Sequence, residues 1–307
     1  MTSDIRLRYL YESARLGTMR AASDKLDVAT SSVSRQISEL ERELGIALIE
    51  KSRRRIKLTD AGEASCMYYK EKLSHEEAFL STIEELKSVR TGKILFAVSE
   101  AFVTQQFSDM LNDYMQKYSG VTVKVVVANT NEVVELVRED EVHLGLIFDT
   151  PSDPKIRSRL TLPQPLKVIV NKNHAFSGKK SINLAELLGE RIGLPVDTYR
   201  MRQTIQIAEQ EEGVFLESSM LTNSQALITD FVKSGRGISI MPEMAVQTEL
   251  LSGQLIALPI NNLTLSSTKF SLITRIGRQL PIGAHRFSLV IETFLKSSVE
   301  TLNEAQP

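Results

Sequence analysis

Residues 18–45 of the chain read TMRAASDKLDVATSSVSRQISELERELG, and this stretch decides the fold of the N-terminal region. Thr18 is a good N-cap for a first helix over 18–26, whose small and apolar residues share one face. A three-residue turn separates it from a second helix over 30–44, and Gly45 is a typical C′ glycine for that helix. Two helices joined by so short a turn predict a helix-turn-helix.

The second helix of this pair has two unlike faces. Thr30 is expected to be its N-cap, and an apolar stripe follows at Val33, Ile37, Leu40 and Leu44. The other face carries Ser31, Ser34, Arg35, Ser38 and Arg42. Small hydroxyls and an arginine at the start of an exposed helix suit close approach to a major groove. An ordinary amphipathic surface helix is the alternative, because helix-turn-helix patterns are loose.

A basic segment follows this helix directly. Residues 46–51 and 54–58 predict two short strands, and Lys51, Arg53, Arg54, Arg55 and Lys57 lie between or within them. A run of charges is usually a solvated surface. Directly after a candidate recognition helix, a basic hairpin tip is better explained as a wing that neutralises phosphates.

The N-terminal sixty residues also carry a family resemblance. SSVSRQI at 31–37, with Ala21-Ala22, Leu26, Leu40-Glu41, Leu44-Gly45, Arg53 to Arg55, Leu58-Thr59 and Ala61-Gly62, resembles the N-terminal signature of LysR-type transcriptional regulators. The resemblance implies a winged helix-turn-helix DNA-binding domain over 1–62. The residues expected to contact double-stranded DNA are Thr30, Ser31, Ser32, Ser34, Arg35, Ser38, Arg53, Arg54 and Arg55.

Composition narrows the class of protein. The 307 residues allow two or three domains, and the net charge of −1 hides an asymmetry. Residues 1–62 hold 12 Lys/Arg against 9 Asp/Glu, a net charge of +3, and the remainder has −4. Cys66 is the only cysteine, so no internal disulfide or thiolate metal cluster is expected. The sequence MTSDIRLRYL at the start has no apolar segment typical of a signal peptide, and no membrane span is expected, so we expect a cytoplasmic protein.

The sequence lacks the common motifs of enzymes and metal proteins. The four histidines are dispersed, with no spacing typical of metal ligands, and neither a GxSxG elbow nor a P-loop is present. We therefore expect no catalytic residue, no metal site and no cofactor.

A long helix is expected from Asp60 to about Val89, and residues 63–90 are assigned to a linker. Cys66, Tyr69, Leu73, Leu80 and Ile83 form a heptad-like seam along it. A helix of about 30 residues is roughly 45 Å long, which is too long for one small domain to cover easily. We favour pairing with a second subunit, as the family resemblance implies, over packing on its own domain.

The pattern changes to alternating strands and helices after Gly92. Strands are expected near 94–98, 121–127, 144–148, 166–170, 192–194, 238–240 and 268–275, with helices between most of them. Such β-α-β order predicts an α/β fold with parallel sheets. By resemblance, residues 91–307 form a two-lobed effector-binding domain similar to periplasmic binding proteins. Lobe I then takes about 91–162 and 266–307, and lobe II about 163–265.

Candidate effector-binding residues lie where strands end. Ligands of open α/β folds sit beyond the carboxyl ends of strands and at helix N-termini. The residues selected are Ser99, Glu100, Thr130, Phe148, Arg200 and Arg202. Each has a plainer alternative: the two hydroxyls are simple N-caps, Phe148 packs in the core, and the arginines are exposed helix charges. Glu100 pairs with one of these arginines or meets an effector amine.

The sequence therefore predicts a DNA-binding transcriptional regulator whose activity responds to a small organic effector, a carboxylate or an amino-acid-like molecule, bound between two lobes. We expect a homodimer or homotetramer, with RNA polymerase as a further partner. The alternative is a solute-binding or enzymatic α/β domain whose N-terminal helices make protein contacts. The effector, the operator and the sign of regulation do not follow from the sequence.

Overall fold

The structure, a computed structural model, describes residues 4–50, 55–86, 92–149 and 153–304. It divides into two compact units, one of Met1–Leu80 with Gly277–Gln279 and one of Ser81–Ile276 with Leu280–Pro307. No helix within the described ranges is long and apolar enough to cross a membrane.

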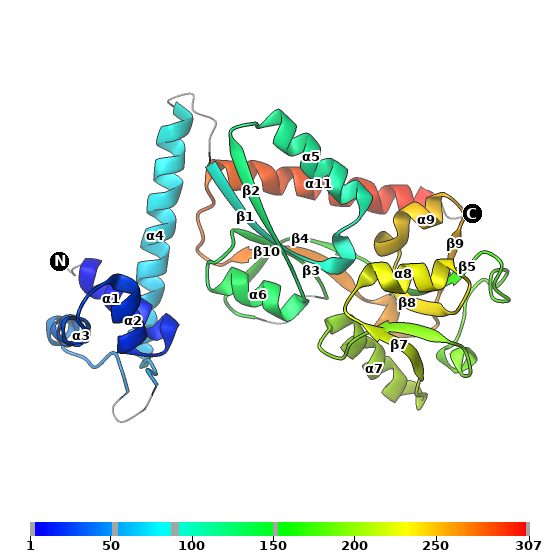
Figure 1. Ribbon diagram of the computed structural model, residues 1–307, viewed down its shortest axis with the longest axis horizontal. Coiled ribbons are helices and arrows are strands. Elements are labelled where there is room, and N and C mark those ends of the chain that lie inside the picture. Colours follow the sequence, from blue (N-terminus) through cyan, green and yellow to red (C-terminus); the bar gives the residue numbers. More distant parts are fainter. Residues whose placement is uncertain (1–3, 51–54, 87–91, 150–152, 305–307) are drawn as a thin grey trace. The chain divides into compact units, whose positions relative to one another are not determined.

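The N-terminal unit is built from helices. They are α1 (Asp4–Leu16), α2 (Met19–Leu26), α3 (Thr30–Leu44) and most of α4 (Asp60–Leu86), shown in Figure 1. As predicted, Thr18 caps α2: its hydroxyl accepts a hydrogen bond from the backbone N–H of Ala21 at 3.1 Å. Helix α1 was not predicted. It packs on α2 and α3, and it contributes the buried Leu7 and Leu10 to their shared core.

The start of α3 differs from the prediction. Its N-cap is Ala29, which has no side chain to cap with, so the expectation that Thr30 caps the helix is wrong. The Thr30 hydroxyl lies 2.8 Å from the hydroxyl of the buried Ser23 and ties α3 to α2. The predicted end is confirmed: Gly45 has a φ of 70°, a left-handed conformation that glycine adopts without strain.

The wing is less regular than two strands. In the part of the chain that the structure describes, Ile49 and Leu58 form an antiparallel bridge, which is flanked by hydrogen bonds from Glu50 N to Lys57 O at 2.9 Å and from Thr59 N to Leu48 O at 3.0 Å. Lys51 to Arg54, at the tip of the predicted hairpin, lie outside the described residues.

The seam predicted along α4 is wrong in its first half. Cys66 and Tyr69 are each 8% exposed and belong to the core of the N-terminal unit together with Val33 and Ile37. Packing on the helix's own domain, the alternative considered above, therefore accounts for them. Leu73 and Leu80, on the continuation of the same face, are 42% and 52% exposed.

The second unit contains two five-stranded sheets. The first has the order β2-β1-β3-β10-β4, with bounds Val121–Ala128, Gly92–Ser99, Leu144–Phe148, Lys269–Arg275 and Ile156–Pro163. We call the half of the unit built on this sheet lobe I. Strands β1, β2 and β3 are parallel, as predicted, but β10 runs antiparallel to both of its neighbours. The sheet is therefore mixed.

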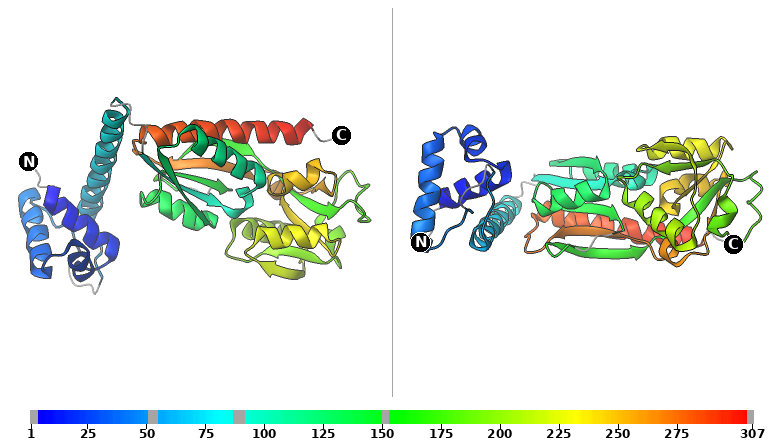
Figure 2. Two further views of the ribbon diagram at one scale, coloured as in Figure 1. Left: turned by 45° about the horizontal axis from the view of Figure 1, so that its top comes forward. Right: turned by 90° about the horizontal axis from the view of Figure 1, so that it is seen from below.

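Helices cover both faces of the first sheet. Figures 1 and 2 show α5 (Gln105–Lys117) and α11 (Ile282–Glu304) on one face and α6 (Thr130–Arg138) on the other. Alternation along β1 explains this arrangement. Phe96 packs with Phe107 of α5 and Phe287 of α11, whereas Ala97 packs with Val133 of α6.

The second sheet, the base of lobe II, is also mixed. Its order is β7-β6-β8-β5-β9, with bounds Ser218–Thr222, Ile192–Pro195, Ile238–Pro242, Leu166–Asn171 and Leu255–Pro259. Strands β6, β7 and β8 are parallel, and β5 is antiparallel to β8 and β9. The helical segments of this lobe are η2 (Leu184–Leu187), α7 (Arg200–Glu212), α8 (Gln225–Lys233), η3 (Glu243–Val246), α9 (Gln247–Leu251) and α10 (Leu263–Ser266).

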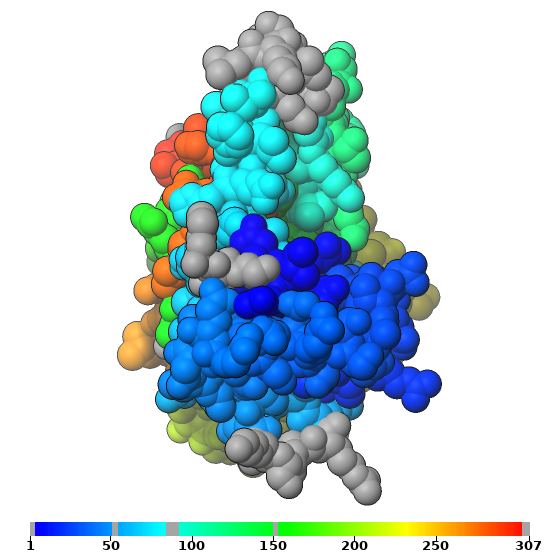
Figure 3. Space-filling model, turned by 90° about the vertical axis from the view of Figure 1, so that its left-hand side faces the viewer, coloured from blue at the N-terminus to red at the C-terminus, as the bar shows by residue number. Residues whose placement is uncertain are grey.

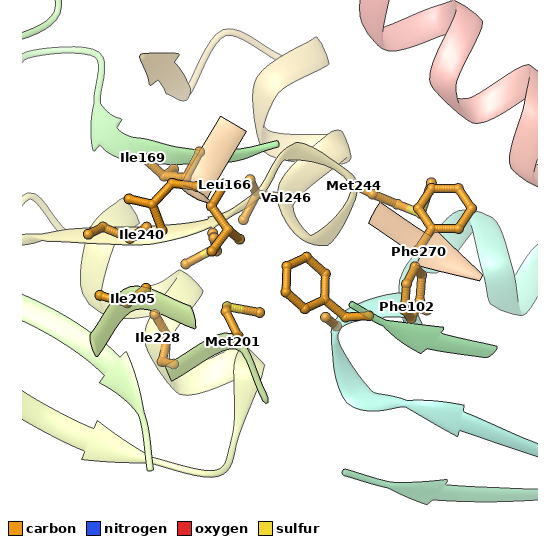
Figure 4. Close-up of a cluster of buried hydrophobic side chains, with 14 of the residues drawn as sticks. Phe102, Leu166, Ile169, Met201, Ile205, Ile228, Ile240, Met244, Val246 and Phe270 are labelled. Atoms are coloured by element: carbon orange, nitrogen blue, oxygen red, sulfur yellow. The ribbon is translucent and has the colours of Figure 1, made fainter. Parts of the chain in front are cut away.

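A hydrophobic cluster joins the two lobes. Figure 4 shows Phe102 and Phe270 from lobe I close to Met244, which follows β8 in lobe II. The two phenyl rings meet edge to face with centroids 5.5 Å apart, and all three side chains are 2% exposed or less. The lobes therefore share part of one core.

Candidate functional site

The residues expected to contact DNA form the exposed side of α3. Val33, Ile37 and Leu40 are at most 2% exposed, which fixes the rotation of the helix. The other side presents the side chains of Thr30, Ser31, Ser32, Ser34, Arg35 and Ser38, all of them exposed. Figure 3 shows the surface formed by α1 to α3, in blue. The apolar stripe read from the sequence thus places these polar side chains at the surface.

Charge is distributed unevenly along α3. Its acidic residues lie in the C-terminal half, where Glu43 binds Arg6 at 2.9 Å and Glu39 binds Arg42. Residues 30–38 contain no acidic side chain. No described residue forms an ion pair with Arg35, so its guanidinium is not neutralised within the described chain. The N-terminal half of the helix also carries the positive end of the helix dipole, which favours phosphate.

Arg55 is the wing arginine that the structure describes, and its side chain is exposed. Arg53 and Arg54 lie outside the described residues. Lys57 contributes less to the basic surface than its charge suggests, because its ammonium lies 2.7 Å from the carboxylate of Glu50.

The wing is anchored to α3 by a residue that the sequence did not point to as functional. The Glu41 carboxylate accepts hydrogen bonds from the backbone N–H groups of Leu48 and Ile49, at 2.8 and 3.3 Å. Gly62 supports the same segment from α4, because a Cβ there would lie 2.1 Å from the carbonyl oxygen of Leu48. The wing is therefore linked to α3 through the Glu41 side chain and to α4 through a close backbone approach at Gly62.

A cavity lies between the two lobes of the second unit. It is bordered by the carboxyl ends of β1, β3 and β6 and by the N-termini of α6, α7 and α8. Its volume is about 30 Å³, and it is lined by Ser99, Glu100, Ala101, Thr130, Phe148, Pro195, Tyr199, Arg200, Met201, Thr222, Asn223, Gln225 and Ile228. Five of the six residues selected from the sequence lie together here, and Arg202 does not.

Two hydroxyls of lobe I face this cavity with different bonding. Thr130 donates to the carbonyl oxygen of Phe148 at 3.1 Å. Neither Thr130 nor Ser99 caps its own helix through the side chain: Asn129 caps α6, and no cap bond forms at Ser99. Ser99 is 6% exposed, and no described residue bonds its Oγ. Ser99 therefore brings an unsatisfied polar atom to the cavity wall.

Glu100 connects the two lobes. Its Oε1 accepts a hydrogen bond from the backbone N–H of Gln225, the first residue of α8, at 2.9 Å. Glu100 thus takes the place of a cap, because the α8 N-cap Ser224 makes no side-chain cap bond. Burial raises the pKa of the nearby Tyr199 phenol, and the charge of Glu100 raises it further. The expected pairing of Glu100 with an arginine is not found among the described residues.

The two arginines of α7 have different environments. Arg200 lines the cavity, and its Nε donates to Asp149 Oδ2 at 2.9 Å, with a third of the side chain exposed. Arg202 points elsewhere and binds the carboxylate of Glu209 at 3.1 Å, where Glu209 is 3% exposed. The plainer alternative of an exposed charge fits neither arginine.

Asp149, Tyr199 and Gln225 complete the polar surroundings of the cavity and were missed from the sequence. Tyr199 and Gln225 precede or begin helices just after strand ends, which is the signal that identified Ser99 and Thr130. Asn223, another lining residue, follows β7, a strand that was not predicted. No group of three or more His, Cys, Asp or Glu side chains within the described ranges is arranged to hold a metal ion.

Comparison with known proteins gives both units a family. A model described as bacterial regulatory helix-turn-helix protein, lysR family, matches residues 5–63. A model described as LysR substrate binding domain matches residues 87–294, more than half of the chain. The RuBisCO operon transcriptional regulator of Allochromatium vinosum is 25% identical over 281 residues, covering 92% of each chain.

Solved structures show the same fold at lower identity. Full-length CbnR, complexed with its target DNA, has a TM-score of 0.54 at 19% identity, covering 95% of this chain and 99% of that chain. The CcmR regulatory domain of Synechocystis PCC6803, in complex with 2-PG, has a TM-score of 0.56 at 20% identity, covering 68% and 98%. The chain belongs to the LysR family and is a DNA-binding transcriptional regulator with an effector-binding domain, not an enzyme.

Proposed function

We propose that this regulator reads DNA with the exposed side of α3 and with its wing arginines. Ser31, Ser34, Arg35 and Ser38 reach base edges or flanking phosphates, and Thr30 and Ser32 support them at the helix start. Arg53, Arg54 and Arg55 neutralise phosphates from the wing. The first half of α3 has no acidic residues, whereas Glu39 and Glu43 in its C-terminal half form ion pairs with arginines, and this contrast supports the assignment. The complex of CbnR with its target DNA supports double-stranded DNA as the partner.

The second part of the proposal is that the cavity between the lobes holds a small anionic effector. The buried Ser99 Oγ carries this assignment, because a buried hydroxyl without a partner is costly and a ligand atom at the cavity wall would satisfy it. The N-termini of α6, α7 and α8 border the same space and favour negative charge. Because Glu100 is engaged with Gln225 in the unliganded cavity, we choose simple acids as the first probes and amino acids as the second.

The CcmR complex supplies the first probe, 2-phosphoglycolate, which is an anion. Calorimetry of the full chain with 2-phosphoglycolate and small carboxylates should find one acid whose presence changes DNA binding. Ser99→Ala should weaken the binding of that acid about twofold to tenfold, which is the value of one net hydrogen bond. It should leave the affinity for DNA in the absence of ligand unchanged. Ser219→Ala, at an exposed serine of β7, is the matched control. Wild-type ligand affinity in Ser99→Ala would place the effector elsewhere.

We further propose that the protein assembles as a homodimer or a dimer of dimers and acts in the cytoplasm, with RNA polymerase as a partner. We place the domain limits near residues 62 and 90. The exposed Leu73 and Leu80 of α4 support self-association. Glutamates at both positions would place unpaired charges in an apolar contact, so the double variant should sediment as a smaller species. An unchanged assembly would show that α4 is not the contact.

A further inference from the structure

Two carboxylates of lobe I each hold a hydrogen-bond donor of lobe II beside the cavity. Glu100, which follows β1, accepts from the N–H of Gln225 at the start of α8, at 2.9 Å. Asp149, which follows β3, accepts from Arg200 Nε at 2.9 Å and from Thr204 Oγ1 at 3.2 Å. The donors are a helix N-terminus and a guanidinium, and these groups are the ones that bind anions in proteins.

The backbone holds Asp149 in place for this contact. Its φ is 49°, in the left-handed region, and its N–H donates to the carbonyl oxygen of Lys269 at 2.7 Å. Aspartate tolerates this conformation better than most residues, but it still carries a conformational cost. The backbone thus fixes the direction of the Cα–Cβ bond of Asp149, from which the carboxylate reaches Arg200.

The space between the lobes is narrow while these bonds are made. A volume of about 30 Å³ has room for one or two water molecules. The charges beside it are Glu100, Asp149 and Arg200, so the local balance is negative and repels an anion. An anion gains a favourable site when at least one carboxylate leaves its donor, because that donor is then free to bind the anion.

We propose that Glu100 and Asp149 act as internal anions, occupying the donors of α8 and α7 in the unliganded cavity, and that the effector anion displaces them. This inference rests on the anionic effector proposed above. In this proposal the two residues set the affinity for the effector, because the effector must compete with them for the donors. The apparent affinity is the intrinsic affinity multiplied by the fraction of time that the donors are free. Displacement also breaks hydrogen bonds that these carboxylates make between the lobes, so ligand binding favours a different lobe arrangement.

The test is calorimetry of the full chain with 2-phosphoglycolate and with inorganic phosphate. Glu100→Gln and Asp149→Asn keep the shape of each side chain and remove its charge. Each should bind 2-phosphoglycolate about tenfold more tightly than the wild type, as expected when a donor occupied most of the time is released. Combining the two should tighten binding further, and Glu217→Gln, at an exposed carboxylate of lobe II, should leave it unchanged.

The outcomes separate this inference from the effector proposal. One outcome is that Ser99→Ala weakens binding while Glu100→Gln and Asp149→Asn bind as tightly as the wild type. That outcome would overturn the role of the two carboxylates as internal anions and keep the effector site. Weaker binding in both neutralising variants would show that the carboxylates help to hold the ligand, which also overturns the inference. Failure of every variant, the double one included, to bind either anion would overturn the internal anions, and the effector proposal would fall as well if the small carboxylates also did not bind. Tighter binding in Glu217→Gln as well would show that the gain comes from the lower net negative charge of the protein, and it would also overturn the inference.

Discussion

The exposed side of α3 and the cavity between the lobes hold arginine in opposite ways. On α3, Arg35 is exposed and no described residue forms an ion pair with it. At the cavity, Arg200 already binds Asp149, and two residues further along, Arg202 is bound to the buried Glu209. Under the proposals above, the exposed side of α3 meets a phosphate or base with an arginine that forms no ion pair within the described residues, whereas an anion at the cavity has to displace the partner of Arg200. The predictions below test where each arginine belongs.

The largest effect is expected for Arg202→Ala. This change leaves the Glu209 carboxylate, 3% exposed, without its arginine, and breaking a buried ion pair from one side typically costs about 3–5 kcal/mol of stability. Arg200→Ala, in the same helix, removes a pair whose members are each about a third exposed and should cost less than about 1 kcal/mol. Urea unfolding of the two variants measures the difference.

The effect on effector affinity should have the opposite order, with the larger loss in Arg200→Ala. Arg200 lines the cavity, so Arg200→Ala should weaken the binding of an anionic effector, whereas folded Arg202→Ala should bind it with the wild-type affinity. Equal stability losses in the two variants, or a ligand defect confined to Arg202→Ala, would reverse the assignment of the two arginines.

A smaller effect is expected for Arg35→Ala. If Arg35 makes a bidentate contact with a base, the variant should lose roughly 1–3 kcal/mol of binding to the operator and tolerate changes at one base pair. Arg42→Ala is the matched control, because Arg42 is exposed on the same helix but is bound to Glu39. Gel-shift titration of both variants on one operator provides the measurement. A loss of equal size in the control would mean that α3 contributes charge rather than sequence reading.

Continuous apolar runs made most of the fold of the second unit predictable. Strands such as β3 and β5 are buried along nearly their whole length, and their residues stand out in the sequence. The strands β4, β7 and β9 were missed, and each lies at the edge of a sheet. Strands β4 and β7 carry polar residues and are identified by their neighbours, which a single sequence does not display, whereas β9 (LIALP) is apolar and its omission has no such explanation.

The cavity residues were predictable as far as strand ends determine them. Ser99, Thr130 and Phe148 lie at or just beyond the carboxyl ends of predicted strands, and all three line the cavity. Arg202 shows the limit of this rule. Consecutive residues of a helix are about 100° apart, so Arg200 and Arg202 point in nearly opposite directions, and the start of α7 had to be known to choose between them.

The smallest effect belongs to the wing, and it tests whether Arg55 resembles Arg35 or Arg42. Arg55 is exposed and follows the tip of the predicted hairpin, so we expect it to meet a phosphate rather than a base. A phosphate contact releases counterions, and its loss should lower the slope of log affinity against log salt by about one unit. Arg55→Ala should therefore weaken binding almost equally on operator and unrelated DNA, and most strongly at low salt. Lys57→Ala is the control within the wing, because Lys57 is neutralised by Glu50 and should change the slope less. An unchanged slope in Arg55→Ala would remove this residue from the DNA contact. A loss confined to the operator would instead give the wing a part in reading sequence, and the contrast between a reading helix and a charge-supplying wing would no longer hold.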